Sequence, residues 1–230
     1  MSLPLDFTFS QNNLQDFLDC ERRFELRYLL KQDWPAVESD PYLAHDQRIE
    51  LGKQFHRLVQ QHQSGIAIIE LEKHIQNSEL IHWWKNYQTY LPKDIPEKQY
   101  AEVILVVPFC GFRLIAKYDL LAIEESQRAI IMDWKTTSLS SRPNSNYLHR
   151  RIQTKVYPFI FTKAGSVFNN RKAWAPNEIS MIYWFPNFPN QPEIIPYSEA
   201  RLSKDQDFLT ELIKKIVSRD TGDFKLTRNQ

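Results

Sequence analysis

The spacing of apolar residues along the chain changes near residue 98. Before that point, apolar residues recur every three or four positions, which places them on one face of a helix. This pattern predicts helices over residues 10–30, 42–62, 66–76 and 78–91, with Ser10 as the N-cap of the first. Residues 1–98 are therefore expected to form a helical N-terminal part.

After residue 98 the pattern favours strands. Runs of β-branched and apolar residues over 100–109, 111–123 and 128–134 are separated by short turns, which predicts an antiparallel meander. A helix over 147–164 is expected to kink at Pro158. Further strands are predicted over 179–185 and 193–197, and a last helix to about Asp220, opened by a capping box at Ser203–Gln206. Residues 99–230 then form the core and the C-terminal helix of a single domain.

Composition narrows the class of protein. The chain has 230 residues, of which 42% are hydrophobic and 25% charged, as in ordinary globular domains. No apolar stretch reaches the roughly 20 residues of a membrane helix, and the N-terminus lacks a signal-peptide pattern. Two cysteines, Cys20 and Cys110, are too few for a disulfide framework. We therefore expect a cytoplasmic protein.

Charge is unevenly distributed although the formal net charge is only +1. Residues 134–177 contain no Asp or Glu, and they carry eight basic residues: Lys135, Arg142, Arg150, Arg151, Lys155, Lys163, Arg171 and Lys172. A solvated surface could have this composition. A track that neutralises the phosphates of a nucleic acid is the more specific interpretation.

The most informative segment joins two acids and a lysine. Asp119 and Asp133 lie on neighbouring predicted strands, and Lys135 shares a strand face with Asp133. Pairing of the strands would gather two carboxylates and an amine, a set that suits Mg²⁺ or Mn²⁺ beside a phosphate. The alternative is an ion pair that ends a strand. A second Asp-x-Lys, Asp223 to Lys225, follows no apolar strand and is taken as a chance match.

Two more features are weaker alone. His56 lies in a predicted helix after Gly52, where a histidine is more often a core or surface residue than a ligand. Gln153 and Tyr157 share one helix face, where they could pack, or could hold the lysine or a phosphate.

In this order, the residues resemble the PD-(D/E)XK nuclease superfamily, and specifically its RecB-like branch, which includes the AddB nuclease domain and CRISPR-associated RecB-like exonucleases. The resemblance rests on four pieces: the first helix (Ser10, Leu14, Phe17, Cys20, Arg23, Phe24), Gly52-x3-His56, Asp119 with Asp133-Trp-Lys135, and Gln153-x3-Tyr157. It implies an α/β restriction-endonuclease-like core, with a mixed sheet flanked by helices. The proline that names the superfamily is replaced by Tyr118.

The resemblance also implies roles for residues. His56, Asp119 and Asp133 would ligate the divalent ion, and Lys135 would position or activate water. Gln153 and Tyr157 would orient Lys135 and the DNA backbone. Among the basic residues of the acid-free stretch, Arg142, Arg150, Arg151 and Lys155 are expected to hold that backbone without reading sequence. Glu102 is an accessory acid or an edge-strand charge. Many relatives bind an iron–sulfur cluster through four cysteines. This chain has two, so no cluster is expected, and Cys20 would be an ordinary buried residue.

The expected function is Mg²⁺- or Mn²⁺-dependent hydrolysis of DNA, from an end, in repair, recombination or CRISPR-related processing. The DNA would be single-stranded or have single-stranded ends, and a helicase or nuclease complex would be the partner. A catalytically inactive nucleic-acid-binding subunit and an RNA substrate remain alternatives.

Overall fold

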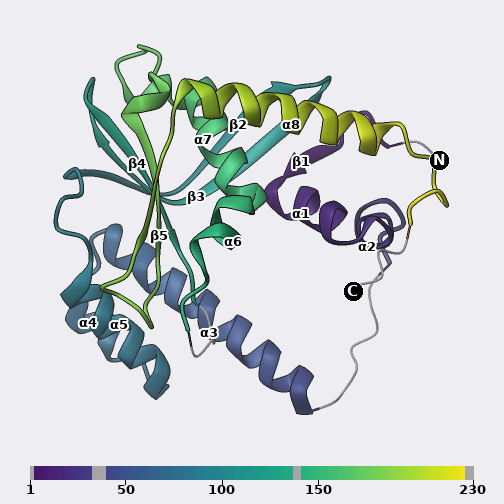
Figure 1. The fold of residues 1–230 in the computed structure, drawn as a ribbon. Coiled ribbons are helices and arrows are strands. Elements are labelled where there is room, and N and C mark those ends of the chain that lie inside the picture. Colours follow the sequence, from purple (N-terminus) through teal and green to yellow (C-terminus); the bar gives the residue numbers. More distant parts are fainter. Residues whose placement is uncertain (1–2, 33–39, 137–140, 226–230) are drawn as a thin grey trace.

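The computed structural model describes residues 3–32, 40–136 and 141–225. Within these residues six strands form one mixed sheet in the order β1-β3-β4-β5-β6, and β2 pairs with the other edge of β3 (Figure 1). The strands are β1 (Thr8–Ser10), β2 (Lys98–Phe109), β3 (Phe112–Glu124), β4 (Arg128–Trp134), β5 (Ile179–Trp184) and β6 (Glu193–Pro196). The predicted meander of β2, β3 and β4 is confirmed.

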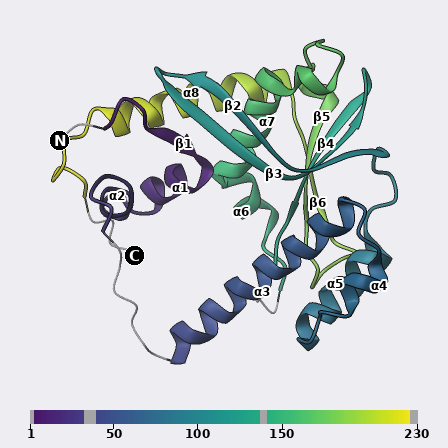
Figure 2. The same ribbon diagram turned by 180° about the vertical axis from the view of Figure 1, so that it is seen from behind.

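Helices cover both faces of the sheet. On one face lie α1 (Gln11–Asp19), α7 (Ile152–Ala164) and α8 (Glu199–Val217), and on the other lie α3 (Asp40–Gln63), α4 (Ile68–Glu72) and α5 (Ser78–Tyr90) (Figures 1 and 2). Each face has its own apolar cluster, named here the α7 core and the α3 core. The expected α/β fold with flanking helices is therefore present. Among the described residues, no helix is both long and apolar enough to cross a membrane.

Strands β2 and β3 are paired, and at the same point along the pair each strand switches which of the two cores its side chains enter. In β3, Tyr118 packs in the α7 core, whereas Leu120, two residues later, packs in the α3 core. In β2, Val103 packs against the α7 core and Ala101 against the α3 core. Residues two apart in a regular strand face the same side. Both strands must therefore twist sharply between these residues.

The pair at the centre of this twist is Glu102 and Asp119. They lie between the paired residues Ala101–Leu120 and Val103–Tyr118, where the register itself skips one pair. Glu102 has a φ of +57°, a left-handed conformation that costs a non-glycine residue about 1–3 kcal/mol. The sheet is thus strained where two acidic residues meet.

The predicted first helix is interrupted. Ser10 caps α1 through a reciprocal pair of hydrogen bonds with Asn13, but the backbone is extended at Cys20. The chain continues as a short helix, α2 (Glu21–Phe24), and a π-helical turn over Glu25–Leu29. The backbone N–H of Arg22 donates to the carbonyl of Lys225, so the break is stabilised by the distant C-terminal segment. Cys20 is half-buried.

The predicted helix over 147–164 is also broken, but not at Pro158. A six-residue helix, α6 (Ser145–Arg150), ends before Arg151, and α7 then runs through Pro158. Gln15 of α1 accepts the backbone N–H of Ile152 at 3.2 Å, which supplies a cap for α7. A tertiary contact therefore places the break seven residues before the proline.

The last helix begins earlier than predicted. Ser198, not Ser203, is the N-cap of α8, and its hydroxyl accepts the backbone N–H of Arg201 at 3.3 Å. The preceding residue, Tyr197, still donates its backbone N–H to Ile179 of β5. Sheet and helix therefore follow each other without a loop.

Candidate active site

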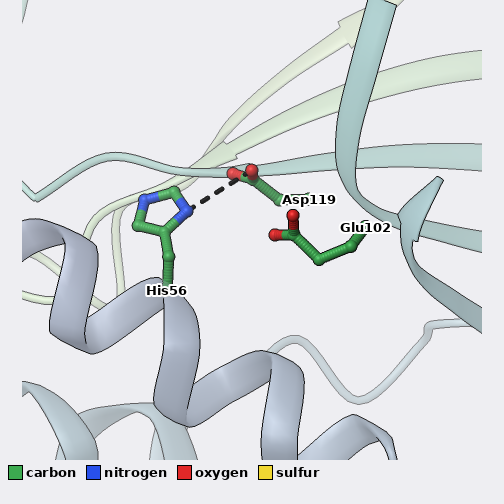
Figure 3. Close-up of side chains that lie close together, drawn as sticks. All are labelled: His56, Glu102 and Asp119. Atoms are coloured by element: carbon green, nitrogen blue, oxygen red, sulfur yellow. Dashed lines mark ion pairs between the residues drawn. The ribbon is translucent and has the colours of Figure 1, made fainter. Parts of the chain in front are cut away.

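Three potential metal ligands converge at the strained point of the sheet. His56 comes from α3, Glu102 from β2 and Asp119 from β3, and one ligand atom of each lies within 4.8 Å of the other two (Figure 3). The His56 Nδ1 lies 3.3 Å from Oδ1 of Asp119. We call these residues the α3-side cluster. All three side chains are partly exposed.

The second oxygen of Asp119 is fixed by the backbone. The N–H of Trp134 donates to its Oδ2 at 2.9 Å. The β3–β4 register ends at Leu120–Met132, so Asp119 and Asp133 are the next pair along. The prediction that strand pairing brings the two acids together agrees with this register.

Asp133 belongs to a separate, buried network on the other face. Lys135 Nζ lies 2.6 Å from Oδ2 of Asp133 and donates to Oε1 of Gln153 at 2.7 Å. The Gln153 amide in turn donates to Oδ1 of Asp133. We call Asp133, Lys135 and Gln153 the α7-side network. The predicted site residues thus gather in two linked groups, and Asp133 is not within the group of close ligand atoms.

Asp133 carries an unfavourable charge. Burial raises its pKa, and the negative charge of Asp119 adds to this effect, while Lys135 acts in the opposite direction. Its Oδ2 is buried and, among the described residues, receives no hydrogen bond of normal geometry. A cation between the two acids would relieve this repulsion.

The charges of the same acids favour the protonated, positively charged form of His56. Burial alone lowers the pKa of its imidazole, but the hydrogen bond and charge of Asp119, together with the charge of Asp133, raise the net pKa above its usual value. The imidazole therefore senses both acids. In its neutral form a ring nitrogen is available to bind a metal ion.

Tyr157 supports the backbone of β3. Its hydroxyl donates to the carbonyl of Lys117 at 2.7 Å, and its own carbonyl accepts from the hydroxyl of Tyr118 at 2.9 Å. Burial, then Asp133 and Asp119, raise the pKa of Tyr157. Of the predicted glutamine–tyrosine pair, Gln153 orients Lys135, and Tyr157 holds the strand that carries Asp119.

Two cavities open beside the ligands. A cleft of about 650 Å³ is lined by His56, Glu102 and Asp119, and a cavity of about 380 Å³ is lined by Lys135. Both are lined by Thr136, so they adjoin there. We call them the acidic cleft and the side cavity.

Gly52 allows α3 to lie close to Thr136, which follows β4. A Cβ at this position would lie 2.6 Å from Oγ1 of Thr136, which is closer than nonbonded atoms tolerate. Gly52 precedes His56 by one turn of α3. The glycine therefore determines how closely His56 can lie to Asp119.

The predicted DNA-binding residues differ in their surroundings. Arg142 is paired with Glu193, and Lys155 lies 3.5 Å from the buried Asp205, so neither has a fully free charge. Arg150 is exposed, and Arg151 lines the side cavity. The ion pairs of Arg142 and Lys155 do not support the role of holding the DNA backbone that was predicted for these two residues.

Sequence reasoning missed the basic side of the acidic cleft. Arg48, Lys53 and Arg57 of α3 line this cleft, although they lie outside the acid-free stretch. Lys53 and Arg57, four residues apart, share one side of the helix, and Arg48 lies one turn before Gly52. That spacing around Gly52 and His56 was the available signal. Glu102, for which an accessory acid and an edge-strand charge were both open, is a full member of the α3-side cluster.

Comparison with known proteins identifies the family. The family model of the PD-(D/E)XK nuclease superfamily matches residues 8–230. The chain belongs to this superfamily. A nuclease of this superfamily hydrolyses phosphodiester bonds and acts on nucleic acid, and such nucleases use divalent metal ions. A search of curated proteins finds no match.

Solved structures show the same fold. A candidate exonuclease from Eubacterium rectale, determined at 2.19 Å, has a TM-score of 0.55 and 10% identity; the alignment covers 90% of this chain and 79% of that one. A second structure, SSO0001, has a TM-score of 0.42 and 13% identity over 93% of this chain and 77% of its own, which is too distant to add to the comparison. The first similarity establishes a restriction-endonuclease-like fold.

Proposed function

We propose that this PD-(D/E)XK protein is a divalent-metal-dependent deoxyribonuclease of the RecB-like branch that degrades DNA from an end. The observation that carries the proposal is the convergence of His56, Glu102 and Asp119 beside the buried Asp133–Lys135 pair. The description of the structural neighbour as an exonuclease supports degradation from an end of the DNA. Because His56 of residues 1–98 contacts Asp119 of residues 99–230, we propose that both parts act as one domain.

The donor set fits Mg²⁺ or Mn²⁺. Carboxylates suit both ions, and Mn²⁺ accepts an imidazole more readily than Mg²⁺ does. Asp119 and His56 would hold the ion with Glu102, and Asp133 would join through its Oδ2. A bound ion supplies positive charge that neutralises the phosphate and acidifies water.

Lys135 has one donor left for the reaction. Its ammonium carries three N–H groups: one donates to Gln153, and the ion pair with Asp133 engages a second. The third can hold the attacking water or a phosphate oxygen, since Lys135 is about one-third exposed at the side cavity. Hydrolysis adds the water oxygen to phosphorus and breaks the bond to the leaving oxygen, which takes up a proton.

Basic residues on α3 provide an entry for the substrate. Arg48, Lys53 and Arg57 line the acidic cleft, and they would bind phosphates without reading sequence. Arg150 and Arg151 would continue this path beyond Lys135. We therefore place the scissile phosphate near Thr136, where the two cavities adjoin.

The test is cleavage of end-labelled DNA by wild type and by Asp133→Asn and Lys135→Ala, with Mg²⁺, Mn²⁺ or chelator. We expect wild-type cleavage only with a metal ion, and loss of roughly 100- to 10,000-fold in each variant. Asp223→Asn is the matched control, because Asp223 and Lys225 repeat the Asp-x-Lys spacing at an exposed site. Cleavage by the Asp133→Asn, Lys135→Ala double variant at the wild-type rate would refute the assignment.

The alternative functions give different results in the same assay. A non-catalytic binding subunit would hold DNA equally well in chelator and would never shorten it. An RNA nuclease would degrade a labelled RNA of the same sequence faster than the DNA. Internal products from a circular single strand would exclude attack from an end.

A further inference from the structure

The side cavity has features that the proposed chemistry does not use. Its volume of about 380 Å³ is near the lower limit of the range for small-molecule sites, roughly 300–1,000 Å³. A single nucleotide fits this scale better than a duplex does. The lining combines Lys135 and Thr136 with two aromatic residues, Tyr147 and Phe185.

The charge of the side cavity differs from that of its neighbour. The acidic cleft is lined by the acids Glu79, Glu102 and Asp119 together with four basic residues, Arg48, Lys53, Arg57 and Lys117, whereas no acid lies among the described residues that line the side cavity. Its charged lining residues are Lys135 and Arg151. A phosphate in the side cavity therefore meets positive charge with no carboxylate among these lining residues, even without a metal ion.

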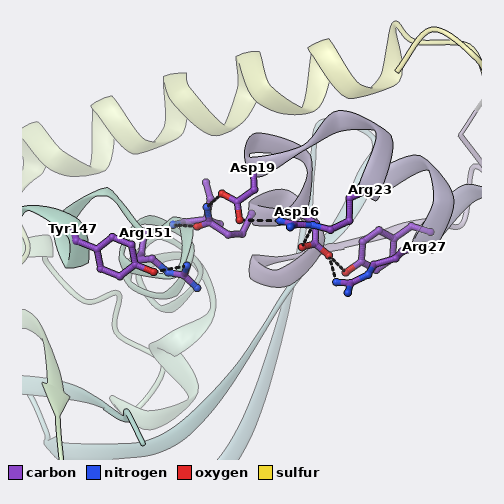
Figure 4. A network of polar contacts seen from close by, with 9 residues as sticks. Asp16, Asp19, Arg23, Arg27, Tyr147 and Arg151 are labelled. Carbon is purple, nitrogen blue, oxygen red and sulfur yellow. Dashed lines mark hydrogen bonds and ion pairs between the residues drawn. The ribbon is translucent and has the colours of Figure 1, made fainter. Parts of the chain in front are cut away.

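Tyr147 and Arg151 form an exposed platform at this cavity. Tyr147 is 54% exposed, and the Arg151 guanidinium lies 5.6 Å from the centre of its ring and donates to its hydroxyl at 3.1 Å (Figure 4). An exposed aromatic ring backed by a guanidinium is a surface on which a nucleobase stacks.

The charge of Arg151 remains available to a ligand. Two acids of α1, Asp16 and Asp19, line a cavity together with Arg151, but the Asp16 carboxylate is already bound by Arg23 and Arg27, each at 2.9 Å (Figure 4). Asp19 is bound by Arg23 at 2.9 Å. These pairs neutralise the acids that would otherwise compete for Arg151.

We propose that the side cavity is a nucleotide subsite, in which one unpaired nucleotide next to the scissile phosphate stacks its base on Tyr147 and places its outer phosphate at Arg151. The proposal rests on the function proposed above and adds a substrate class to it. A base can reach Tyr147 only when it has left a duplex. The substrate therefore needs at least one unpaired nucleotide beside the cleaved bond.

The test measures binding in chelator, so that it does not depend on cleavage. Fluorescence anisotropy compares a labelled single strand of thymidines with its duplex, for wild type, Tyr147→Ala and Tyr147→Phe. Tyr90→Ala is the matched control, because Tyr90 is 44% exposed on α5 and lines neither cavity. Melting curves confirm that each variant is folded.

For Tyr147→Ala we expect single-strand affinity to fall roughly 5- to 100-fold, the loss of one stacked base. Tyr147→Phe keeps the ring and should bind like wild type, and duplex affinity should not change. A 2-aminopurine base in the strand should be quenched by wild type but not by Tyr147→Ala. Unchanged single-strand affinity in Tyr147→Ala, or an equal loss in Tyr147→Phe, would overturn the subsite.

The subsite and the nuclease function can fail separately. A chain that binds single strands through Tyr147 but never cleaves them would keep the subsite and lose the nuclease. A chain that cleaves normally while Tyr147→Ala binds like wild type would keep the nuclease and lose the subsite.

Discussion

The two halves of the site differ in how tightly the protein holds them. In the α3-side cluster, the Asp119 side chain is 15% exposed and that of His56 30%, and Glu102 occupies a strained backbone conformation. In the α7-side network, Asp133 and Gln153 are almost fully buried and joined to Lys135. The open half can accept a ligand, whereas the buried half is arranged before any ligand arrives.

This difference assigns separate tasks to the two faces of the sheet. Residues from α3, β2 and β3 provide ligand atoms that border the acidic cleft. Residues from β4 and α7 fix one lysine and one carboxylate at the neighbouring strand end. The twist of β2 and β3 brings the two groups to one edge, which explains why Glu102 carries strain at that point.

The largest effect expected in the open half comes from removing one of its ligands. Asp119→Asn should lower cleavage about 100- to 1,000-fold, because the replaced oxygen can no longer attract the cation. It should leave the melting temperature in chelator close to that of wild type. The measurement is the rate of end-labelled DNA degradation with Mn²⁺, together with a melting curve. Asp207→Asn, on the exposed side of α8, is the control.

A smaller effect is expected from adding a side-chain atom where α3 lies against Thr136. Gly52→Ala places a Cβ 2.6 Å from Oγ1 of Thr136, and the strain should cost about 1–3 kcal/mol and displace His56. Thr136→Ala removes that oxygen, and the next atom, Cβ of residue 136, is 3.6 Å away. The double variant should therefore recover both stability and activity. Failure of this rescue would show that Gly52 matters for another reason.

The buried half predicts a gain in stability together with a loss of activity. Burial raises the pKa of Asp133 above its unfolded value of about 3.9. The protonated Asp133 therefore stabilises the folded state fully below that pH, and this stabilisation is lost as the pH rises through the folded pKa. Asp133→Asn should therefore be more stable than wild type near pH 7 in chelator, by about 0.5–2 kcal/mol. Denaturant titrations at several pH values test this, and a gain that did not shrink toward pH 4 would contradict it.

The smallest effect concerns the support of the nucleotide subsite. Glu193 is paired with Arg142 and bonded to Ser145 and His149; burial opposes these contacts, which together lower the pKa of its carboxyl. Their stability is present above the unfolded pKa of about 4.3 and is lost as the pH falls through the lowered folded value. Glu193→Gln should lower the free energy of unfolding by about 1 kcal/mol or less at pH 7, and should not change it at a pH below the folded pKa of Glu193. Chemical denaturation at both pH values measures this.

The sequence predicted the parts of the fold that depend on local pattern. The meander of β2, β3 and β4, the N-cap Ser10 and the opposition of Asp119 and Asp133 follow from alternation, capping and register. Lys135 and Gln153 meet as the resemblance implied. Their roles in catalysis remain predictions.

The missed features depend on tertiary contacts. The break at Cys20 is stabilised by Lys225, and the break before α7 by Gln15, and neither partner is near in sequence. The three-residue strand β1 is too short to show alternation. The part that Glu102 plays emerges only where two strands twist together, because its position in an exposed edge strand resembles that of any surface charge.

The central claim is that both halves of the site meet around one cation. Pulsed electron paramagnetic resonance of the Mn²⁺-loaded protein tests it most directly, because an imidazole ligand couples its nitrogen nucleus to the manganese spin. We predict a nitrogen coupling in wild type that disappears in His56→Gln, and weaker Mn²⁺ binding in both Asp119→Asn and Asp133→Asn. A spectrum without that coupling, or Mn²⁺ affinity unchanged by all three substitutions, would contradict the account.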